Sequence, residues 1–404
     1  MHVGLDRLAR LPSLVERLRS QRVALLAHPA SVDRHLRHAG AVLADLGVHP
    51  TVLFGPEHGY GGEAQDMIGV ADARDAATGA PIVSLYGDDE ACLVPTAAHL
   101  ALADVLLVDL ADVGARYYTF VWTALLAVRA AARAGLSCVV LDRPNPLGGD
   151  LAATEGSLQR RGFTSFVGLE PVPVRHALTL GEIVALFASR DGLSLGRDGA
   201  LCVAGVEGWT RSDHARSWDR PFVLPSPNMP TGDTALVYPG GCLLEGTNLS
   251  EGRGTTRPFE IVGAPWIDGQ RLARELSATE LPGFVARPLT FCPTFHKHAG
   301  QTCGGVQVHV TDARRFQPVA TYLALVALAA AHDPARFRFR TERYEFRDDV
   351  PAFDLLTGSP AAREAIEACA PWQDAVEAAA PVDARWNDTR AEALVASARA
   401  SWID

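Results

Sequence analysis

Short apolar runs alternate with amphipathic helical patterns along the first half of the chain. The runs are rich in Val, Leu and Ala and are bounded by turn-forming residues. This alternation is typical of βαβ units with a parallel sheet. We therefore predict an α/β fold that begins with a Rossmann-like domain. The expected strands are 22–29, 50–59, 104–114 and 137–146, and the expected helices between them are 32–47 and 117–135.

The second half has a less regular pattern. Its expected elements are a helix at 179–189, an extended Pro-rich stretch at 221–231, a strand at 304–312, a helix at 318–333 and helices within 360–400. A chain of 404 residues exceeds what one hydrophobic core usually supports. We therefore expect two domains, a Rossmann-like α/β catalytic domain at 1–235 and a smaller α+β auxiliary domain at 236–404.

Polar loops follow three of the four expected strands. They read Pro-Glu-His-Gly at 56–59, Asp-Val-Gly-Ala-Arg at 112–116 and Asp-Arg-Pro-Asn-Pro at 142–146. In open parallel sheets, ligands bind outside the carboxyl ends of the strands. We therefore expect the three loops to share one rim.

The side chains of these loops allow a functional and a structural interpretation. A carboxyl group shielded from water favours its protonated form, so Glu57 could be a general acid. Equally, Glu57 could cap the next helix and His58 could be a turn residue. Arg116 could help to hold an anion at a helix N-terminus. Alternatively, Asp112 could be a helix cap and Tyr118 a core residue.

Residues 238–260 carry the densest group of polar side chains, including Glu245, Glu251, Arg253 and Arg257. Intervening glycines disfavour a regular helix, so these side chains can converge on a ligand. The segment has no lysine and no GxxxxGK[ST] pattern, which argues against a phosphate-binding loop. The chain also lacks a GxGxxG turn after its first strand and a GxSxG elbow.

Composition excludes several further classes of function. A formal charge of −10 argues against a nucleic-acid or anionic-membrane surface. The apolar runs are too short to span a bilayer, and no secretory leader is evident, so we expect a cytoplasmic protein or a mature form whose leader was removed. Seven scattered cysteines suit reduced thiols. His296 and His298 lack a third ligand in view, which favours a surface strand over a metal site, and no cofactor is predicted.

A lysine-free set of Glu, Asp, Asn, Tyr, His and Arg side chains therefore remains as the candidate site. Glycoside hydrolysis is the chemistry that uses such a set most naturally. It needs one carboxyl group to protonate the leaving oxygen and another to act as base, nucleophile or stabiliser.

Eight ordered motifs make this interpretation specific. They are FGPEHGYGG, SLYG, DLADVGARYYT, LDRPNPLGG, SFVG, PSPNMPT, YPGGCLLEGTNLSEGRGTTRPFEIVGAPW and CGGVQVHVTD. In this order they resemble a family of exo-lytic β-N-acetylmuramidases (NamZ-like), formerly a domain of unknown function, from about Val3 to the end of the chain. The resemblance implies release of N-acetylmuramic acid from the non-reducing ends of peptidoglycan fragments. It also implies an active site in the cleft between two domains.

The resemblance assigns site residues by matching motif positions. The implied catalytic residues are Glu57, His58, Glu245 and Glu251. The implied substrate-binding residues are Asp112, Arg116, Tyr118, Asn145, Asn228, Asn248, Arg253 and Arg257. Two positions depart from the family pattern, with Ala111 in place of Gln and His28 in place of Asn.

We hypothesise that Glu57 is the general acid and that Glu245 or Glu251 serves the anomeric centre. Arg253 or Arg257 would bind the lactyl carboxylate with paired hydrogen bonds. Retaining, inverting and substrate-assisted mechanisms all stay open. The alternatives are a muropeptide-binding protein without catalysis and, less favoured, a nucleotide-linked enzyme. The expected partner is a small muropeptide, and no oligomeric state is predicted.

Overall fold

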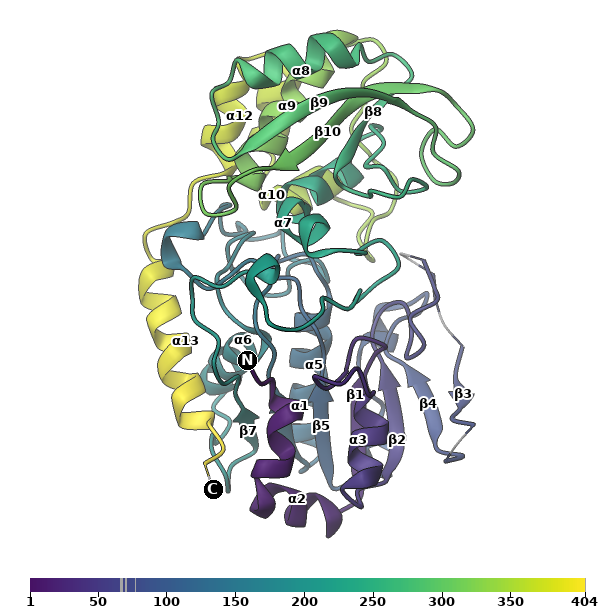
Figure 1. The fold of residues 1–404 in the computed structure, drawn as a ribbon, viewed down its shortest axis with the longest axis vertical. Coiled ribbons are helices and arrows are strands. Elements are labelled where there is room, and N and C mark those ends of the chain that lie inside the picture. The colour runs from purple at the N-terminus through teal and green to yellow at the C-terminus, as the bar shows by residue number, and fades with distance from the viewer. Residues whose placement is uncertain (66–67, 70, 77, 404) are drawn as a thin grey trace.

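The computed structural model describes residues 1–65, 68–69, 71–76 and 78–403. Two sheets lie in different parts of the molecule (Figure 1). Among the described residues, the larger sheet has the strand order β3-β4-β2-β1-β5-β6-β7 and the smaller has the order β8-β10-β9. The strands of the larger sheet are β1 (Val23–Ala27), β2 (Pro50–Gly55), β3 (Ala73–Arg74), β4 (Pro81–Ser84), β5 (Val105–Asp109), β6 (Ser137–Leu141) and β7 (Leu201–Ala204).

The larger sheet is parallel except at one edge. β4, β2, β1, β5, β6 and β7 pair in parallel, and only β3 pairs antiparallel, with β4. The predicted α/β fold with a Rossmann-like parallel sheet is therefore confirmed, and the four expected strands correspond to β1, β2, β5 and β6. The apolar pattern did not single out β4 and β7, which are both short.

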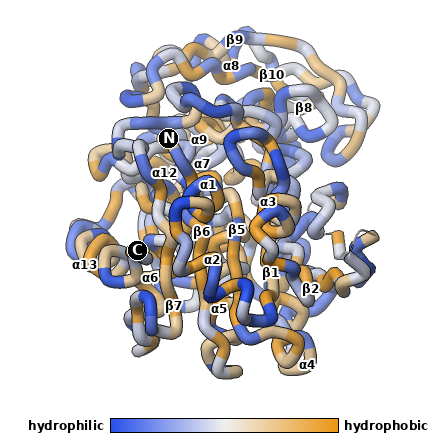
Figure 2. Tube along the Cα trace, turned by 60° about the horizontal axis from the view of Figure 1, so that its bottom comes forward, coloured by the Kyte–Doolittle hydropathy of each residue, from blue (hydrophilic) through white to orange (hydrophobic). Residues whose placement is uncertain are grey.

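Successive residues of the central strands enter two different hydrophobic clusters. Leu26 and Val108 belong to the cluster that contains helices α5 (Phe120–Arg133) and α6 (Leu180–Arg190). Leu25 and Leu107 belong to the cluster that contains α2 (Pro12–Arg19) and α3 (Ala39–Asp45). Because both faces are covered by helices, the strands are mostly apolar, as Figure 2 shows for β1, β5 and β6.

The smaller sheet is antiparallel and carries its own helices. Its strands are β8 (Ile261–Ala264), β9 (Phe284–Phe291) and β10 (Cys303–Val310). The helices of this half are α7 (Gly232–Gly241), α8 (Gly269–Ser277), α9 (Pro318–His332), α10 (Ala352–Thr357), α11 (Ala361–Glu367) and α12 (Trp372–Ala379). Two further short helices, α1 (Gly4–Arg7) and α4 (Ala97–Leu100), belong to the first half. In Figure 1, α7 and α10 lie between the two sheets.

The last helix, α13 (Trp386–Ala400), returns to the half that carries the larger sheet. It packs on α6, far from the three-stranded sheet (Figure 1). Just beyond it, the Trp402 N–H donates to the carbonyl oxygen of Val203 in β7 at 2.9 Å. The boundary near residue 235 stays a prediction, and it assigns to the second domain a helix that packs on the first.

Two expectations from composition concern membranes and thiols. In the described part of the chain, no helix combines the length and apolar character needed to cross a bilayer. All seven cysteines are unpaired, and Cys92, Cys292 and Cys369 are exposed.

The order of the strands explains where the site forms. β2 and β4 lie on one side of β1 in the sheet. The strands that follow in the chain, β5, β6 and β7, lie on the other side of β1. At such a switch point the carboxyl ends of neighbouring strands leave room for a ligand. The loops after β2, β5 and β6 therefore lie at one rim.

Gly55, the last residue of β2, allows the chain to turn sharply into this rim. A Cβ atom at this position would lie 2.2 Å from the backbone nitrogen of Tyr60. We expect Gly55→Ala to lower the free energy of unfolding by about 1–3 kcal/mol, because the backbone must move to admit the methyl group. Chemical denaturation measures this change. Gly205→Ala is the control, because its nearest neighbour would be 3.9 Å away, and equal losses in both variants would contradict the argument.

Candidate active site

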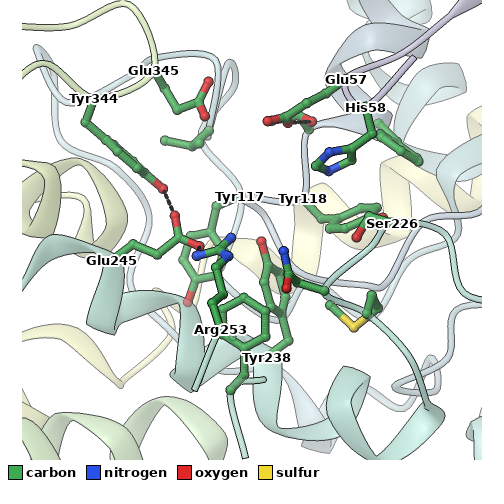
Figure 3. Close-up of a pocket in the computed structure, with 16 residues that line it drawn as sticks. Glu57, His58, Tyr117, Tyr118, Ser226, Tyr238, Glu245, Arg253, Tyr344 and Glu345 are labelled. Atoms are coloured by element: carbon green, nitrogen blue, oxygen red, sulfur yellow. Dashed lines mark hydrogen bonds and ion pairs between the residues drawn. The ribbon is translucent and has the colours of Figure 1, made fainter. Parts of the chain in front are cut away.

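A cavity between the two halves of the chain brings together several of the predicted residues (Figure 3). It holds about 490 Å³ of space that no atom fills, part of it open to solvent. The lining residues are Glu57, His58, Tyr117, Tyr118, Thr119, Phe120, Val167, Ser226, Asn228, Met229, Tyr238, Glu245, Arg253, Phe259, Tyr344 and Glu345.

The turn after β2 places Glu57 and His58 in the cavity wall. His58 has a φ of 72°, a left-handed conformation that is uncommon outside glycine. Its ring is held by a hydrogen bond from Nδ1 to the carbonyl oxygen of Ala64, at 2.9 Å. The carboxylate of Glu57 accepts a hydrogen bond from the Thr119 hydroxyl at 2.7 Å. These contacts fix both side chains toward the cavity.

Aromatic rings form the floor of the cavity. Tyr238 packs edge to face against Tyr117, Tyr118 and Phe259, with ring centroids 5.9, 5.8 and 4.9 Å away. Tyr117 also donates a hydrogen bond to the carbonyl oxygen of Pro239. Burial raises the pKa of Tyr118 and Tyr238 well above the usual value. Their hydroxyl groups therefore stay protonated at neutral pH and can donate hydrogen bonds.

Glu245 approaches the cavity from the other half of the chain, in the 3₁₀ turn η5 (Cys242–Gly246). Its carboxylate accepts a hydrogen bond from the hydroxyl of Tyr344 at 2.7 Å and forms an ion pair with Nη1 of Arg253 at 2.9 Å. The guanidinium of Arg253 also lies 5.0 Å above the ring of Phe259. Two polar contacts and a stacked ring therefore hold Glu245 and Arg253 in one arrangement, as Figure 3 shows.

Glu251 is fully buried behind Arg253 and does not line the cavity. Its carboxylate accepts from Arg253 at 3.2 Å, from Nδ1 of His296 at 2.9 Å and from Nζ of Lys297 at 2.9 Å. Burial alone would raise the pKa of Glu251, but the charge of Lys297, with His296 and Arg253, holds it well below the usual value. Glu251 is therefore an ionised anchor for Arg253.

The loop that contacts Glu251 corrects one prediction from the sequence. Residues 295–300 form a turn between β9 and β10, so the expected surface strand around His296 and His298 is wrong. Lys297 also donates to the carbonyl oxygen of Leu244 at 2.8 Å. It is the single lysine in the sequence, so the site, expected to contain no lysine, has one lysine behind it.

Arg116 lies outside the cavity lining, and its side chain donates to backbone groups of the described residues. Its buried guanidinium donates to the carbonyl oxygens of Ser157 at 2.7 Å, Val172 at 2.9 Å and Leu356 at 2.5 Å. Leu356 belongs to α10, in the second half of the chain. Arg116 therefore links the two halves, and the structure does not bring it to the cavity where substrate binding was expected.

Two of the predicted asparagines also bond to backbone away from the cavity lining. The Asn145 amide donates to the carbonyl oxygen of Leu178 at 2.9 Å. The Asn248 amide donates to the carbonyl oxygen of Arg336 at 2.8 Å. Both side chains hold loops in place, and neither lines the cavity.

Of the remaining predicted asparagine and arginine, Asn228 lines the cavity and Arg257 does not. Asn228 donates to Oε1 of Gln65 at 2.8 Å. Arg257 has 44% of its side chain exposed and lies 3.5 Å from Glu260. Of the two arginines considered for the lactyl group, only Arg253 therefore lies in the cavity wall.

Asp112 lies in a second cavity, at the carboxyl ends of β1, β5 and β6. One of its oxygens accepts a hydrogen bond from the backbone N–H of Gly114 at 2.7 Å. The neighbouring Ala111 donates its N–H to Nε2 of His28 at 2.9 Å. Burial lowers the pKa of His28 well below the usual value, so the ring stays neutral. The two positions that depart from the family pattern are thus hydrogen-bonded to each other.

Sequence reasoning missed several residues that line the cavity. Tyr238 and Ser226 stood inside the quoted motifs, so their position could have drawn attention to them. Tyr344 and Glu345 come from an irregular stretch without a motif, and no spacing pattern indicated them. Among the described residues, no group of His, Cys, Asp and Glu side chains is arranged to hold a metal ion.

Asp112→Asn should change how stability depends on pH. Burial raises the pKa of Asp112 from 3.8 to about 7, so the folded protein keeps a proton that the unfolded chain releases near pH 4. Between these pH values the folded state binds more protons, and rising pH therefore lowers stability. The wild type should lose melting temperature relative to Asp112→Asn as the pH rises from about 4 to about 7.

Thermal denaturation at several pH values measures this difference. Burial also raises the pKa of Asp142 and Glu155 to about 7, and because both proteins contain these groups, the difference between their curves reports chiefly on Asp112. Parallel curves for the two proteins would show that Asp112 is ionised in the folded state.

Two family models match the chain. The model described as exo-β-N-acetylmuramidase NamZ, N-terminal, matches residues 23–233, and the corresponding C-terminal model matches residues 236–395. A curated relative, peptidoglycan β-N-acetylmuramidase NamZ of Bacillus subtilis (strain 168), is 40% identical over 368 residues. That alignment covers 91% of this chain and 84% of the relative.

Two solved structures, both DUF1343 family proteins from Bacteroides fragilis NCTC 9343, are similar to this chain. One is 30% identical with a TM-score of 0.85, and the match covers 98% of this chain and 97% of the other. The second has a TM-score of 0.68 at 24% identity with the same coverage, which shows a shared fold alone. With both family models matched and a relative aligned over nine-tenths of the chain, this protein belongs to the exo-β-N-acetylmuramidase NamZ family.

Proposed function

We propose that this chain is an exo-acting glycoside hydrolase that releases N-acetylmuramic acid from the non-reducing ends of peptidoglycan fragments. Its membership of the NamZ family supports the reaction and the substrate class. One structural observation carries the proposal for the site. Glu57 from the first half and Glu245 from the second half reach the same cavity, with Arg253 beside Glu245 (Figure 3).

Glu57 acts as the general acid in this proposal. Glu57 follows a strand end and is 6% exposed as a residue, and Thr119 fixes the orientation of its carboxyl group. A buried carboxyl group in a cavity wall can protonate the oxygen that leaves the sugar. His58, next in the chain, lines the same wall and adds a second polar group there.

Glu245 serves the anomeric centre. Tyr344 donates a hydrogen bond to its carboxylate and Arg253 forms an ion pair with it, and contacts of this kind suit an anion that must hold one position. Glu251, the other candidate, faces Arg253, His296 and Lys297 instead of the cavity. We therefore assign Glu251 a positioning role through Arg253.

Arg253 is also the group proposed to meet the lactyl carboxylate of the substrate. It is the arginine of the cavity wall, and a guanidinium can offer paired hydrogen bonds to a carboxylate. The proposed cleft runs between the half with the larger sheet and the half with the smaller one. A cytoplasmic location, with imported fragments as substrates, is part of the proposal.

The first test compares two chromogenic substrates, a β-N-acetylmuramide and the matching N-acetylglucosaminide, which lacks the lactyl group. We expect release from the muramide alone. Glu57→Gln and Glu245→Gln should each lower kcat by about 10²–10⁴-fold, because each amide keeps the shape but cannot exchange a proton or carry the charge.

Glu377→Gln, at an exposed position of α12, is the matched control and should turn over normally. Near-normal turnover by Glu57→Gln would contradict its assignment as the acid. Release from neither substrate, with natural muropeptide also inert, would reject hydrolysis.

Lys297→Met should weaken the site without a direct contact to substrate. Glu251 would lose its ion pair with Lys297 and attract Arg253 more strongly. Arg253 would then interact less strongly with Glu245. We expect kcat/KM to fall about 10-fold, consistent with loss of a hydrogen bond to a charged group. Lys297→Arg should restore part of the activity because it keeps the charge and the donor. Unchanged kcat/KM in folded Lys297→Met would contradict this role.

A further inference from the structure

A tight turn at Tyr344–Arg347 carries an unusual sequence. The Tyr344 N–H donates to the Arg347 carbonyl oxygen at 2.8 Å, and the Arg347 N–H donates back to Tyr344 at 3.0 Å. Glu345 and Phe346 between them have φ values of 45° and 68°. Two central residues with positive φ are typical of a type I′ turn, which normally takes Asn and Gly. Glu and Phe are poorly suited to this backbone.

The surrounding contacts hold the turn in this conformation. The Phe346 ring packs against Tyr86 and Phe166, with centroids 5.7 and 6.1 Å away. The guanidinium of Arg347 donates to the carbonyl oxygen of Thr164 at 2.7 Å. A strained conformation that persists because its neighbours enforce it is often part of a functional site. Here the turn belongs to the second half of the chain, and Phe346 and Arg347 bind it to residues of the first half.

The result of this strain is the placement of Glu345. The residue is 6% exposed, and its side chain lines the cavity and accepts a hydrogen bond from the Tyr86 hydroxyl at 3.2 Å. In Figure 3, Glu345 and Glu57 reach toward the cavity from opposite sides. Glu345 is thus a third carboxylate of the cavity, and neither of the proposed catalytic roles uses it.

We propose that Glu345 is a substrate-binding residue that accepts a hydrogen bond from the free 4-hydroxyl of the terminal sugar. The inference rests on the proposed function, in which Glu57 protonates the oxygen on C1. In a pyranose ring, C1 and C4 lie at opposite ends. With C1 placed between Glu57 and Glu245, the third carboxylate of the cavity, Glu345, is assigned to the C4 end of the ring.

This contact gives a physical reason for exo action. At a free non-reducing end, O4 carries a proton that a carboxylate can accept, whereas inside a glycan strand O4 is an ether oxygen without a proton. An internal sugar would offer no proton to the Glu345 carboxylate at this position, so it would bind without that hydrogen bond. The same negative charge repels the lactyl carboxylate, which directs that group toward Arg253.

The test compares a chromogenic β-N-acetylmuramide with its 4-deoxy analogue. On the parent substrate, Glu345→Asn and Glu345→Gln should lower kcat/KM by about 10- to 100-fold, the range for a hydrogen bond to a charged group. The wild type should lose a similar factor on the 4-deoxy substrate. Neither variant should lose much more on that substrate, because the contact is already absent.

Stability separates this role from a structural one. Asn tolerates positive φ, so Glu345→Asn should melt at the wild-type temperature or above it while activity falls. Glu342→Gln, at an exposed position of the same segment, is the matched control for removing a charge. Equal losses on both substrates, or a lower melting temperature with unchanged activity, would overturn the inference. A wild type inactive on the muramide would reject the proposed function, and this inference with it.

Discussion

Burying the carboxylate of Glu251 is the constraint on which the rest of the site depends. An isolated charge in a protein interior is strongly unfavourable, and it becomes tolerable only when cations and hydrogen-bond donors surround it. Arg253, His296 and Lys297 supply them, from two separate loops of the second half. Arg253 then extends the network to Glu245. The position of a cavity carboxylate is therefore set by a charge that lies outside the cavity wall.

The cavity also depends on how the two halves of the chain are joined. Glu57 and Tyr118 come from the half with the parallel sheet, whereas Glu245 and Tyr344 come from the other. Their relative placement has to be fixed closely for chemistry between them. Buried hydrogen bonds across the junction, such as those from Arg116 to Leu356 and from Tyr117 to Pro239, provide this rigidity. Polar residues beside the cavity thus hold its walls together.

The sequence predicted the elements that have a strong local pattern. β1, β2, β5 and β6 are buried on both faces and appear as apolar runs, and the loop with Glu57 and His58 lies at the expected rim. Motifs could not tell a cavity residue from a neighbour that holds the backbone, because both kinds lie within the same motifs of the sequence. Arg116 and Asn248 are examples of the second kind. Lys297 and Glu345 were missed because tertiary contacts alone determine the path of their irregular segments.

The return of α13 to the larger sheet has a mechanical consequence. The half with the smaller sheet is connected to the rest of the molecule at two places in the chain, before α7 and before α13. A body held by one connection can swing in any direction, whereas a body held by two can rotate only about the line that joins them. Any opening of the cavity by movement of the two halves is therefore restricted to one hinge axis, and Glu245, Arg253 and Tyr344 would move along that single path together.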